Sequence, residues 1–215
     1  MDNRQRECFE KAYDTAAELI LKATDEFTEM FPGSASVNNF YQPVKMTDWT
    51  EGFWTGEVWL AYEKTGNEKL KKTAETEVEN FMRRIKDRIV VDHHDMGFLF
   101  SPSCVAAYKL TGNETGKEAA LMAADNLLGR FQEKGQFVQA WGELGAEDNY
   151  RLIIDCLLNM PLLFWAGEVT GDPKYAEKAQ AHIKTAMKCI IREDNSTYHT
   201  YFFDKNTGEP LRGVT

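Results

Sequence analysis

The chain repeats one pattern three times: an apolar segment ends in Thr-Gly, and a polar, amphipathic segment follows. The copies contain WLAYEKTGNEKLKKTAETEVENF, VAAYKLTGNETGKEAALMAADNL and LFWAGEVTGDPKYAEKAQAHIKTAM, with marker glycines Gly66, Gly112 and Gly171. A glycine just past a helix supplies the left-handed backbone conformation that ends it. Each copy is therefore expected to be a helical hairpin, the building unit of helical repeat folds.

The two helices of each hairpin differ in the distribution of their apolar residues. The first helices, EGFWTGEVWLAYEKTG, SPSCVAAYKLTG and RLIIDCLLNMPLLFWAGEVTG, are apolar nearly all round, whereas the second helices each carry a charged face. A helix that is apolar on all sides is buried, and one with a single apolar stripe lies outside. The alternation predicts an all-α chain with inner and outer helices, as in an α/α toroid or an α-solenoid.

The segments that flank the inner helices carry further signals. Ser101 and Pro102 are expected to start the second inner helix as its N-cap and first residue. The segments VKMTDWTEGFWTG, VVDHHDMGFLFSPS and QFVQAWGELGAEDNYRLIID hold aromatic, histidine and carboxylate side chains, which a purely structural solenoid does not need. The tail NSTYHTYFFDKNTGEPLRGVT indicates a β-hairpin or a long loop. A functional site at the mouths of the inner helices is therefore expected.

Asp155 lies inside an almost unbroken apolar run, RLIIDCLLNMPLLFWA. Burying a lone carboxylate is costly unless it is paired, protonated or used. Arg151 and Asn159 lie four residues away on either side and would share a helix face with Asp155, so an internal ion pair with Arg151 is one interpretation. The other is a carboxyl whose proton affinity is raised by burial and suits a general acid.

The stretch HHDMGF contains His93, His94 and Asp95. A metal site is one interpretation, but neighbouring residues rarely all face one ion, and no HxxxH or second cluster supports it. An ordinary polar loop is another. We favour a ligand-binding loop in which His94 donates hydrogen bonds and Asp95 lies near the reacting centre.

Two of the five tryptophans, Trp49 and Trp141, lie in polar, glycine-containing loops at the mouths of inner helices. Sugar rings stack on exposed aromatic faces, so both are candidates to line a carbohydrate site. His199, in the loop-rich tail, is either a surface residue or a second hydrogen-bond donor. The other tryptophans lie in apolar helical runs and are expected in the core: Trp54, Trp59 and Trp165.

Composition excludes several classes of function. The formal net charge of -9 argues against sequence-independent nucleic-acid binding. The four cysteines form no CxxC pair, and three lie in apolar helical patterns, which indicates buried thiols in a reducing compartment. We expect a cytoplasmic protein without a membrane span, because no signal peptide and no apolar run of roughly 20 residues is present. No nucleotide-binding fingerprint is present, and we expect neither a cofactor nor a metal.

Several motifs occur together in an order that resembles the unsaturated glucuronyl hydrolases, glycoside hydrolase family 88: WTEGFWTGEVWLAYE, HHDMGFLFSPS, QAWG, RLIIDCLLN and STYHTYFFD. The resemblance implies an (α/α)6 toroid of helical hairpins. It also implies a glycosidase that acts in glycosaminoglycan degradation and releases the 4,5-unsaturated uronate from the non-reducing end of lyase-generated oligosaccharides. In that reaction a carboxyl protonates C4, water adds at C5 and the hemiketal collapses, so the inverting and retaining schemes do not apply.

The resemblance also implies roles for particular residues. The family's proton donor matches Asp155, and its second essential aspartate matches Asp95. Its substrate-binding residues match four positions, where the aromatic rings would contact sugars and the histidines would reach the uronate or its hydroxyls: Trp49, His94, Trp141 and His199.

Family members are considerably longer than these 215 residues. We therefore expect one domain, residues 1–215, that is truncated at its C-terminus and forms about half of the toroid. Alone it is expected to be inactive and to self-associate through an exposed apolar edge. The related unsaturated rhamnogalacturonyl hydrolases are the enzymatic alternative. A non-catalytic helical-repeat binding module is the alternative from a different class.

Overall fold

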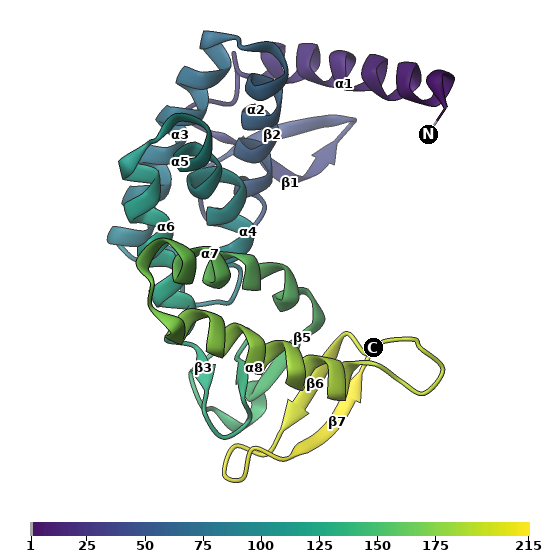
Figure 1. The fold of residues 1–215 in the computed structure, drawn as a ribbon, viewed down its shortest axis with the longest axis vertical. Coiled ribbons are helices and arrows are strands. Elements are labelled where there is room, and N and C mark those ends of the chain that lie inside the picture. The colour runs from purple at the N-terminus through teal and green to yellow at the C-terminus, as the bar shows by residue number, and fades with distance from the viewer. Residues whose placement is uncertain (1) are drawn as a thin grey trace.

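The protein is described here by a computed structural model that covers residues 2–215, and helices dominate it (Figure 1). The α-helices are α1 (Asn3–Ala23), α2 (Glu51–Thr65), α3 (Glu68–Lys86), α4 (Met96–Phe100), α5 (Ala106–Thr111), α6 (Glu114–Leu128), α7 (Met160–Thr170) and α8 (Pro173–Ile190). The strands are β1 (Phe31–Val37), β2 (Phe40–Val44), β3 (Phe131–Gln132), β4 (Phe137–Val138), β5 (Arg151–Ile153), β6 (Thr200–Phe203) and β7 (Pro210–Val214).

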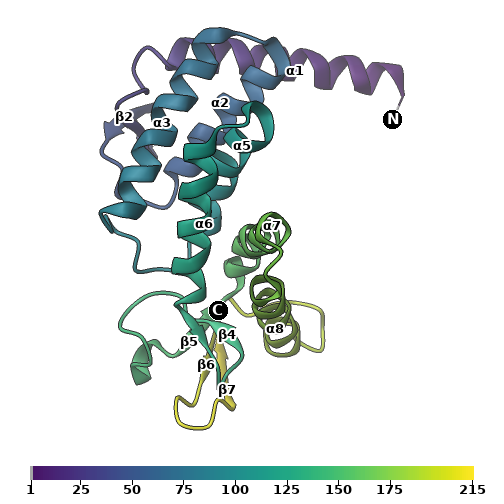
Figure 2. The same ribbon diagram turned by 60° about the vertical axis from the view of Figure 1, so that its left-hand side comes forward.

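The three expected hairpins are present, and they alternate between inner and outer helices as predicted. The inner elements α2, α4–α5 and α7 pack on one another in that order, and the outer helices α3, α6 and α8 do the same behind them. Gly66, Gly112 and Gly171 end the inner helices with φ angles of 65°, 71° and 73°. Figures 1 and 2 show the hairpins following one another in an open arc.

Two glycines let the inner helices approach backbone to backbone near their N-termini. A Cβ atom on Gly52 would lie 2.1 Å from the carbonyl oxygen of Phe98, and one on Gly97 would lie 2.3 Å from the Cα of Asn159. The side chain of Asn159 accepts a hydrogen bond from the backbone N–H of Phe98 at 2.9 Å. These contacts bring the N-terminal ends of α2, α4 and α7 together on one side of the arc.

The second inner helix begins earlier than the sequence predicted. Asp95, not Ser101, precedes its first residue, and Pro102 lies inside the helical stretch. Residues Ser101–Val105 form one π-helical turn that joins α4 to α5. Because proline has no N–H to donate, a helix that contains it must rearrange locally, and a π turn is one such rearrangement.

The third inner helix begins later than predicted. Residues Arg151–Ile153 form strand β5, residues Ile154–Asn159 form a 3-10 helix, and α7 starts only at Met160. The strand pairs with β6, which pairs with β7 in an antiparallel three-stranded sheet. The predicted hairpin in the tail is therefore confirmed. Arg151 and Asp155 lie in different elements, so the predicted helix face that they would share does not exist.

The tryptophans are buried or exposed as the sequence predicted. Trp54, Trp59 and Trp165 are buried, whereas Trp49 and Trp141 are 44% and 43% exposed. Cys8 is exposed, and the other three cysteines are buried: Cys104, Cys156 and Cys189. No disulfide joins any of the four among residues 2–215.

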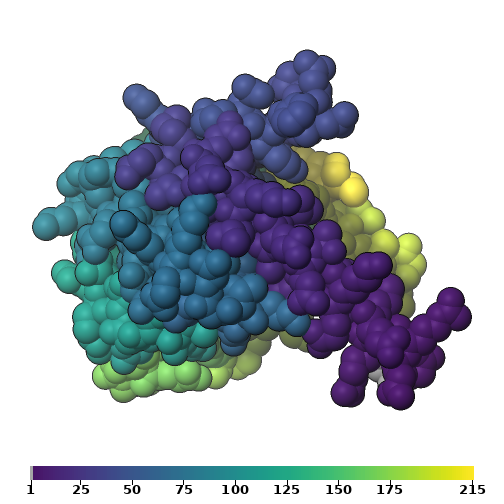
Figure 3. Space-filling model, turned by 90° about the horizontal axis from the view of Figure 1, so that it is seen from above, coloured from purple at the N-terminus to yellow at the C-terminus, as the bar shows by residue number. Residues whose placement is uncertain are grey.

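Helix α1 stands apart from the hairpins. It contacts α2, but Ala17 is its one fully buried residue, and Figures 1 and 3 show it projecting from the body. It carries Phe9 and Leu19 on its exposed surface. No helix between residues 2 and 215 is both long and apolar enough to cross a membrane.

Candidate active site

Three predicted site residues meet at the mouth of the inner helices. Asp95 immediately precedes α4, and Asp155 lies in the 3-10 helix that leads into α7. The Nε2 atom of His94 lies 3.2 Å from Oδ1 of Asp95 and 3.6 Å from Oδ1 of Asp155. We call these three residues the His94 cluster. The close approach of α4 to Asn159 explains why residues so far apart in sequence meet here.

Members of the His94 cluster differ strongly in exposure. The His94 side chain is fully buried, that of Asp95 is 13% exposed, and that of Asp155 is 40% exposed. The sequence-based expectation of a buried Asp155 is therefore wrong as stated. Because the chain arrives as a strand and turns into a 3-10 helix, Asp155 lies at the rim of the core. Its Oδ1 atom is buried without a hydrogen-bond partner in the described chain.

Burial shifts the pKa values of Asp155 and His94 in opposite directions. Desolvation raises the pKa of Asp155, the charge of Asp95 raises it further, and His94 opposes the change. Desolvation lowers the pKa of His94, against the attraction of Asp95 and Asp155. Both shifts favour an uncharged pair in which a protonated carboxyl faces a neutral imidazole. Such a carboxyl keeps its transferable proton to a higher pH than an exposed aspartic acid does.

Two other predicted binding residues, Trp141 and His199, lie near this centre. The ring of Trp141 packs edge-on against His94, with ring centroids 6.0 Å apart. The charge of His199 contributes to the environment of Asp155, and its backbone carbonyl accepts a hydrogen bond from Ile154 N–H at 2.9 Å.

Trp49 lies one layer further out. Its ring centroid is 5.9 Å from that of Phe53 and 5.4 Å from that of Phe98, which is in the first turn of α4. The three rings form an aromatic surface beside the His94 cluster, in which Trp49 and Phe53 are exposed.

The internal ion pair between Asp155 and Arg151 is contradicted. The guanidinium of Arg151 instead stacks over the ring of Trp141 at 4.8 Å and lies 5.7 Å from the ring of Phe202. No ion pair joins Arg151 to Asp155 in the part of the chain that the structure describes. Of the two interpretations of Asp155, the ion pair is thus wrong, and the stack of Arg151 on Trp141 was missed because it depends on strand pairing.

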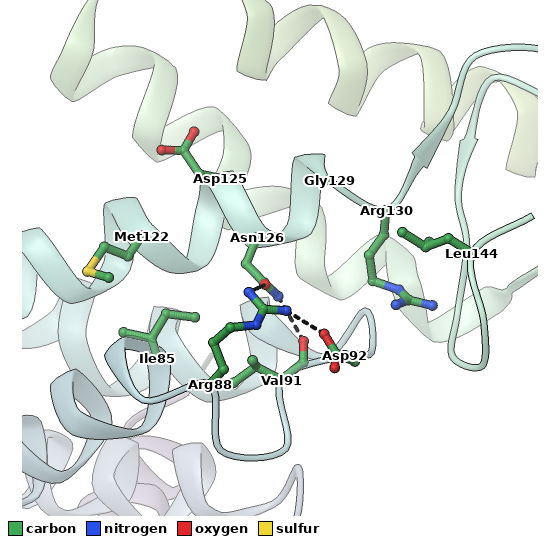
Figure 4. Close-up of a pocket in the computed structure, with 10 residues that line it drawn as sticks. All are labelled: Ile85, Arg88, Val91, Asp92, Met122, Asp125, Asn126, Gly129, Arg130 and Leu144. Atoms are coloured by element: carbon green, nitrogen blue, oxygen red, sulfur yellow. Dashed lines mark hydrogen bonds and ion pairs between the residues drawn. The ribbon is translucent and has the colours of Figure 1, made fainter.

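A buried arginine holds the loop that carries Trp141. Arg130 donates from Nε to the carbonyl of Gln139 at 2.9 Å and from Nη2 to that of Gly142 at 3.1 Å. Arg130 also lines a cavity of about 500 Å³ between α3, α6 and the following loops (Figure 4). The cavity contains Arg88 and Asp92, which pair at 2.5 Å, but no member of the His94 cluster.

The His94 cluster also offers one nitrogen and two carboxylate oxygens within 4.8 Å of one another. It is the one group of this kind found between residues 2 and 215. A histidine and two carboxylates are a set that zinc can use, so these residues would be its ligands. The expectation that no metal binds stays a prediction.

Comparison with known proteins places this arrangement in a family. Residues 19–215 match the profile of Glycosyl Hydrolase Family 88. The chain belongs to this family. Membership confirms the resemblance seen in the motifs, and it confirms that the chain is built like a glycosidase of the unsaturated glucuronyl hydrolase type.

Individual relatives support this family 88 assignment. An unsaturated chondroitin disaccharide hydrolase of Streptococcus agalactiae serotype III (strain NEM316) is 50% identical over 206 residues, 96% of this chain and 52% of that protein. The unsaturated glucuronyl hydrolase of Bacillus sp. (strain GL1) is 41% identical over 208 residues, 96% of this chain and 55% of that protein. The chain therefore spans about half the length of the curated relatives it matches.

Solved structures give the same picture for the family 88 fold. The crystal structure of an unsaturated glucuronyl hydrolase from Streptococcus agalactiae matches with a TM-score of 0.91 at 50% identity, covering 94% of this chain and 52% of the other. That of the Bacillus sp. GL1 enzyme matches with a TM-score of 0.89 at 42% identity, covering 92% and 53%. The hairpins thus form about half of an α/α toroid, as predicted.

Proposed function

We propose that this chain carries the acid–base centre of a hydrolase that releases a 4,5-unsaturated uronate from the non-reducing end of lyase-generated oligosaccharides. The observation that carries the proposal is the state of Asp155. Its carboxyl is partly open to a ligand, holds one buried oxygen without a partner, and has a raised pKa. A group with these properties holds its proton to a higher pH than an exposed carboxyl does and can deliver it to a bound substrate.

The reaction needs one proton at carbon and one water. Asp155 donates its proton to C4 of the enol ether, and the electron pair of the C4=C5 bond forms the new C–H bond. Water then adds to C5, and its proton returns to the Asp155 carboxylate. The C5 hemiketal opens to a ketone, which leaves C1 as a hemiacetal that still carries the shorter sugar. Collapse of this hemiacetal breaks the bond from C1 to the glycosidic oxygen, forms an aldehyde at C1 and releases the shorter sugar, whose oxygen takes up the hydroxyl proton. The net change is the addition of one water molecule.

Asp95 suits a different role from Asp155. It is less exposed, it lies within 2.9 Å of Nδ1 of His93, and it lies within 3.2 Å of His94. A carboxylate held this way stabilises positive charge that develops at C5 and fixes hydroxyls beside the double bond. In the proposal His94 remains a neutral imidazole whose buried Nε2 faces the carboxyl groups of Asp95 and Asp155.

The aromatic residues supply the sugar-binding part of the proposal. Trp141 and Trp49 present partly exposed rings, Trp141 against His94 and Trp49 against Phe98 of α4, and His199 lies near Asp155. We propose a disaccharide of the chondroitin type as the substrate, because three relatives at 46–50% identity carry that name. Another similar structure, at 30% identity, is described as specific for heparin, so a heparin disaccharide is the comparison substrate.

A chimera tests the proposal most directly. The matching half of the Streptococcus agalactiae relative is replaced by this chain, and turnover of an unsaturated chondroitin disaccharide is followed as loss of the absorbance of the conjugated double bond. Turnover is expected in the chimera and is expected to be lost when Asp155 becomes Asn. An active chimera that is insensitive to Asp155→Asn would show that the proton donor lies elsewhere.

A further inference from the structure

A fully buried ion pair lies behind the candidate active site. Glu51, the first residue of α2, and Arg84, near the end of α3, are 0% and 1% exposed, with Nη1 of Arg84 3.3 Å from Oε2 of Glu51. Neither residue belongs to the His94 cluster. A buried ion pair is weak evidence for stability, because desolvating both charges costs about as much as their attraction returns. Its hydrogen bonds indicate another role.

Arg84 ties together two loops that lead into inner helices. It donates from Nε to the carbonyl of Ile89 at 3.1 Å and from Nη2 to that of Val90 at 2.9 Å, both in the loop before α4. It also donates from Nη1 to the carbonyl of Asp48 at 2.8 Å, in the loop before α2. The guanidinium is suited to this because its donors form a rigid planar fork, which an ammonium group lacks.

Glu51 completes the connection on the side of α2. Its Oε1 atom accepts hydrogen bonds from the backbone N–H groups of Thr47 at 2.9 Å and Asp48 at 2.7 Å. The next residue, Trp49, belongs to the aromatic surface beside the site. The ion pair therefore fixes the backbone immediately before this ring.

The loop before α4 needs such support, because its backbone is strained. Arg88 and Val90 have φ angles of 55° and 46°. A β-branched residue rarely adopts a positive φ and does so where surrounding contacts hold it. The carbonyl of Val90 also contacts Nε2 of His93 at 2.9 Å, and Nδ1 of His93 accepts from the backbone N–H of Asp95 at 3.1 Å. The chain of contacts thus runs from Arg84 to Asp95.

We infer that Arg84, anchored by Glu51, is a positioning residue for the active site: it holds the loop backbone that places His93 and Asp95, and through Asp48 it fixes the loop that carries Trp49. Among residues 2–215, the hydrogen bonds and the ion pair of Arg84 go to Ile89, Val90, Asp48 and Glu51, and none goes to the His94 cluster or the aromatic surface. The inference rests on the proposed function only for its catalytic meaning, since the positioning itself is measurable without substrate.

Nuclear magnetic resonance of the four histidines tests the positioning in the 215-residue chain. Two variants are compared with the natural chain: Arg84→Lys, which keeps the charge but loses the fork, and the double variant Glu51→Gln/Arg84→Met, which removes both charges. Because the ring of His93 is held by the carbonyl of Val90 and the N–H of Asp95, its ring proton signals are expected to shift in both variants. His182 is the internal control, because its Nδ1 is held by the N–H of Val138 rather than by a group of these loops.

Unchanged ring signals of His93 in a variant whose circular dichroism is native would overturn the inference and leave a merely structural ion pair. Hydrogen exchange of the natural chain covers the case in which neither variant folds. The N–H groups of Thr47 and Asp48 are expected to exchange as slowly as those of α3, and free exchange of these loop amides would also overturn the inference. Neither result depends on turnover, so a failure here is distinguishable from failure of the proposed function.

Discussion

Replacing Glu77 by Gln is expected to stabilise the protein at neutral and alkaline pH. Glu77 lies on α3, fully buried, and its Oε1 accepts a hydrogen bond from the indole N–H of Trp54 at 2.7 Å. Its Oε2 atom has no partner in the described chain. Desolvation raises the pKa of Glu77 to about 8, against hydrogen bonds from Thr55 and Trp54 that lower it.

The pH dependence follows from this shift. Below the pKa of the unfolded chain, near 4.5, the carboxyl is protonated in both states and ionisation costs nothing. Between about 4.5 and 8 the unfolded chain gives up its proton and the folded chain keeps it, so the free energy of unfolding falls as pH rises. One pKa unit corresponds to about 1.4 kcal/mol, so the full loss approaches about 5 kcal/mol at pH 8.

Urea unfolding followed by circular dichroism measures this difference. Glutamine keeps the oxygen that accepts from Trp54 but does not ionise, so the Glu77→Gln variant and the natural chain should diverge from pH 5 upward. The matched control is Glu79→Gln, two residues along the same helix, where the side chain is exposed. If the free energies of unfolding of Glu77→Gln and of the natural chain change in parallel from pH 5 to 9, the reasoning is refuted.

Three further outcomes are expected. In the chimera, Asp155→Asn lowers kcat by about 10² to 10⁴, the usual contribution of general acid–base catalysis, without changing the melting temperature; a lower melting temperature with unchanged turnover per folded molecule would contradict this. Trp141→Ala raises KM about tenfold or more, because it removes a ring that is 43% exposed beside His94; an unchanged KM would exclude sugar contact. The isolated chain self-associates through exposed apolar residues of α1 such as Phe9; a monomer at all concentrations in sedimentation would disprove this.

Local signals in the sequence predicted most of the helical architecture. The ends of the inner helices depend on single glycines, and burial depends on the apolar pattern within one helix, so neither requires knowledge of distant contacts. The start of α7 was predicted wrongly for the opposite reason. The run Arg151–Ile153 suits either a helix or a strand, and it becomes strand β5 only because residues Thr200–Phe202 pair with it.

In the candidate site, too, residues with a local sequence signal could be predicted, and residues that depend on distant contacts could not. Asp155 was recognisable because it stood inside an apolar run, and His94 and Asp95 because they lie in a segment rich in histidine and carboxylate side chains that leads into an inner helix. Arg84 was not recognisable, because a basic residue in MRRIK on an outer helix ordinarily faces solvent. Its burial depends on Glu51, 33 residues earlier, and on carbonyl groups that carry no sequence signal.

Because this chain spans about half the length of its relatives, we expect kcat and KM to depend on different halves of the whole protein. The proposed proton donor and its neighbours all lie on segments that lead into inner helices of this chain, so the chemical step should be determined here. The remaining half of the relatives can then change substrate binding without changing protonation at C4. In chimeras that pair this chain with that half from two different relatives, the pH dependence of kcat should stay the same while KM for sulfated and unsulfated disaccharides changes. A pH profile of kcat that instead followed the relative's half would mean that this chain contributes scaffold rather than acid–base chemistry.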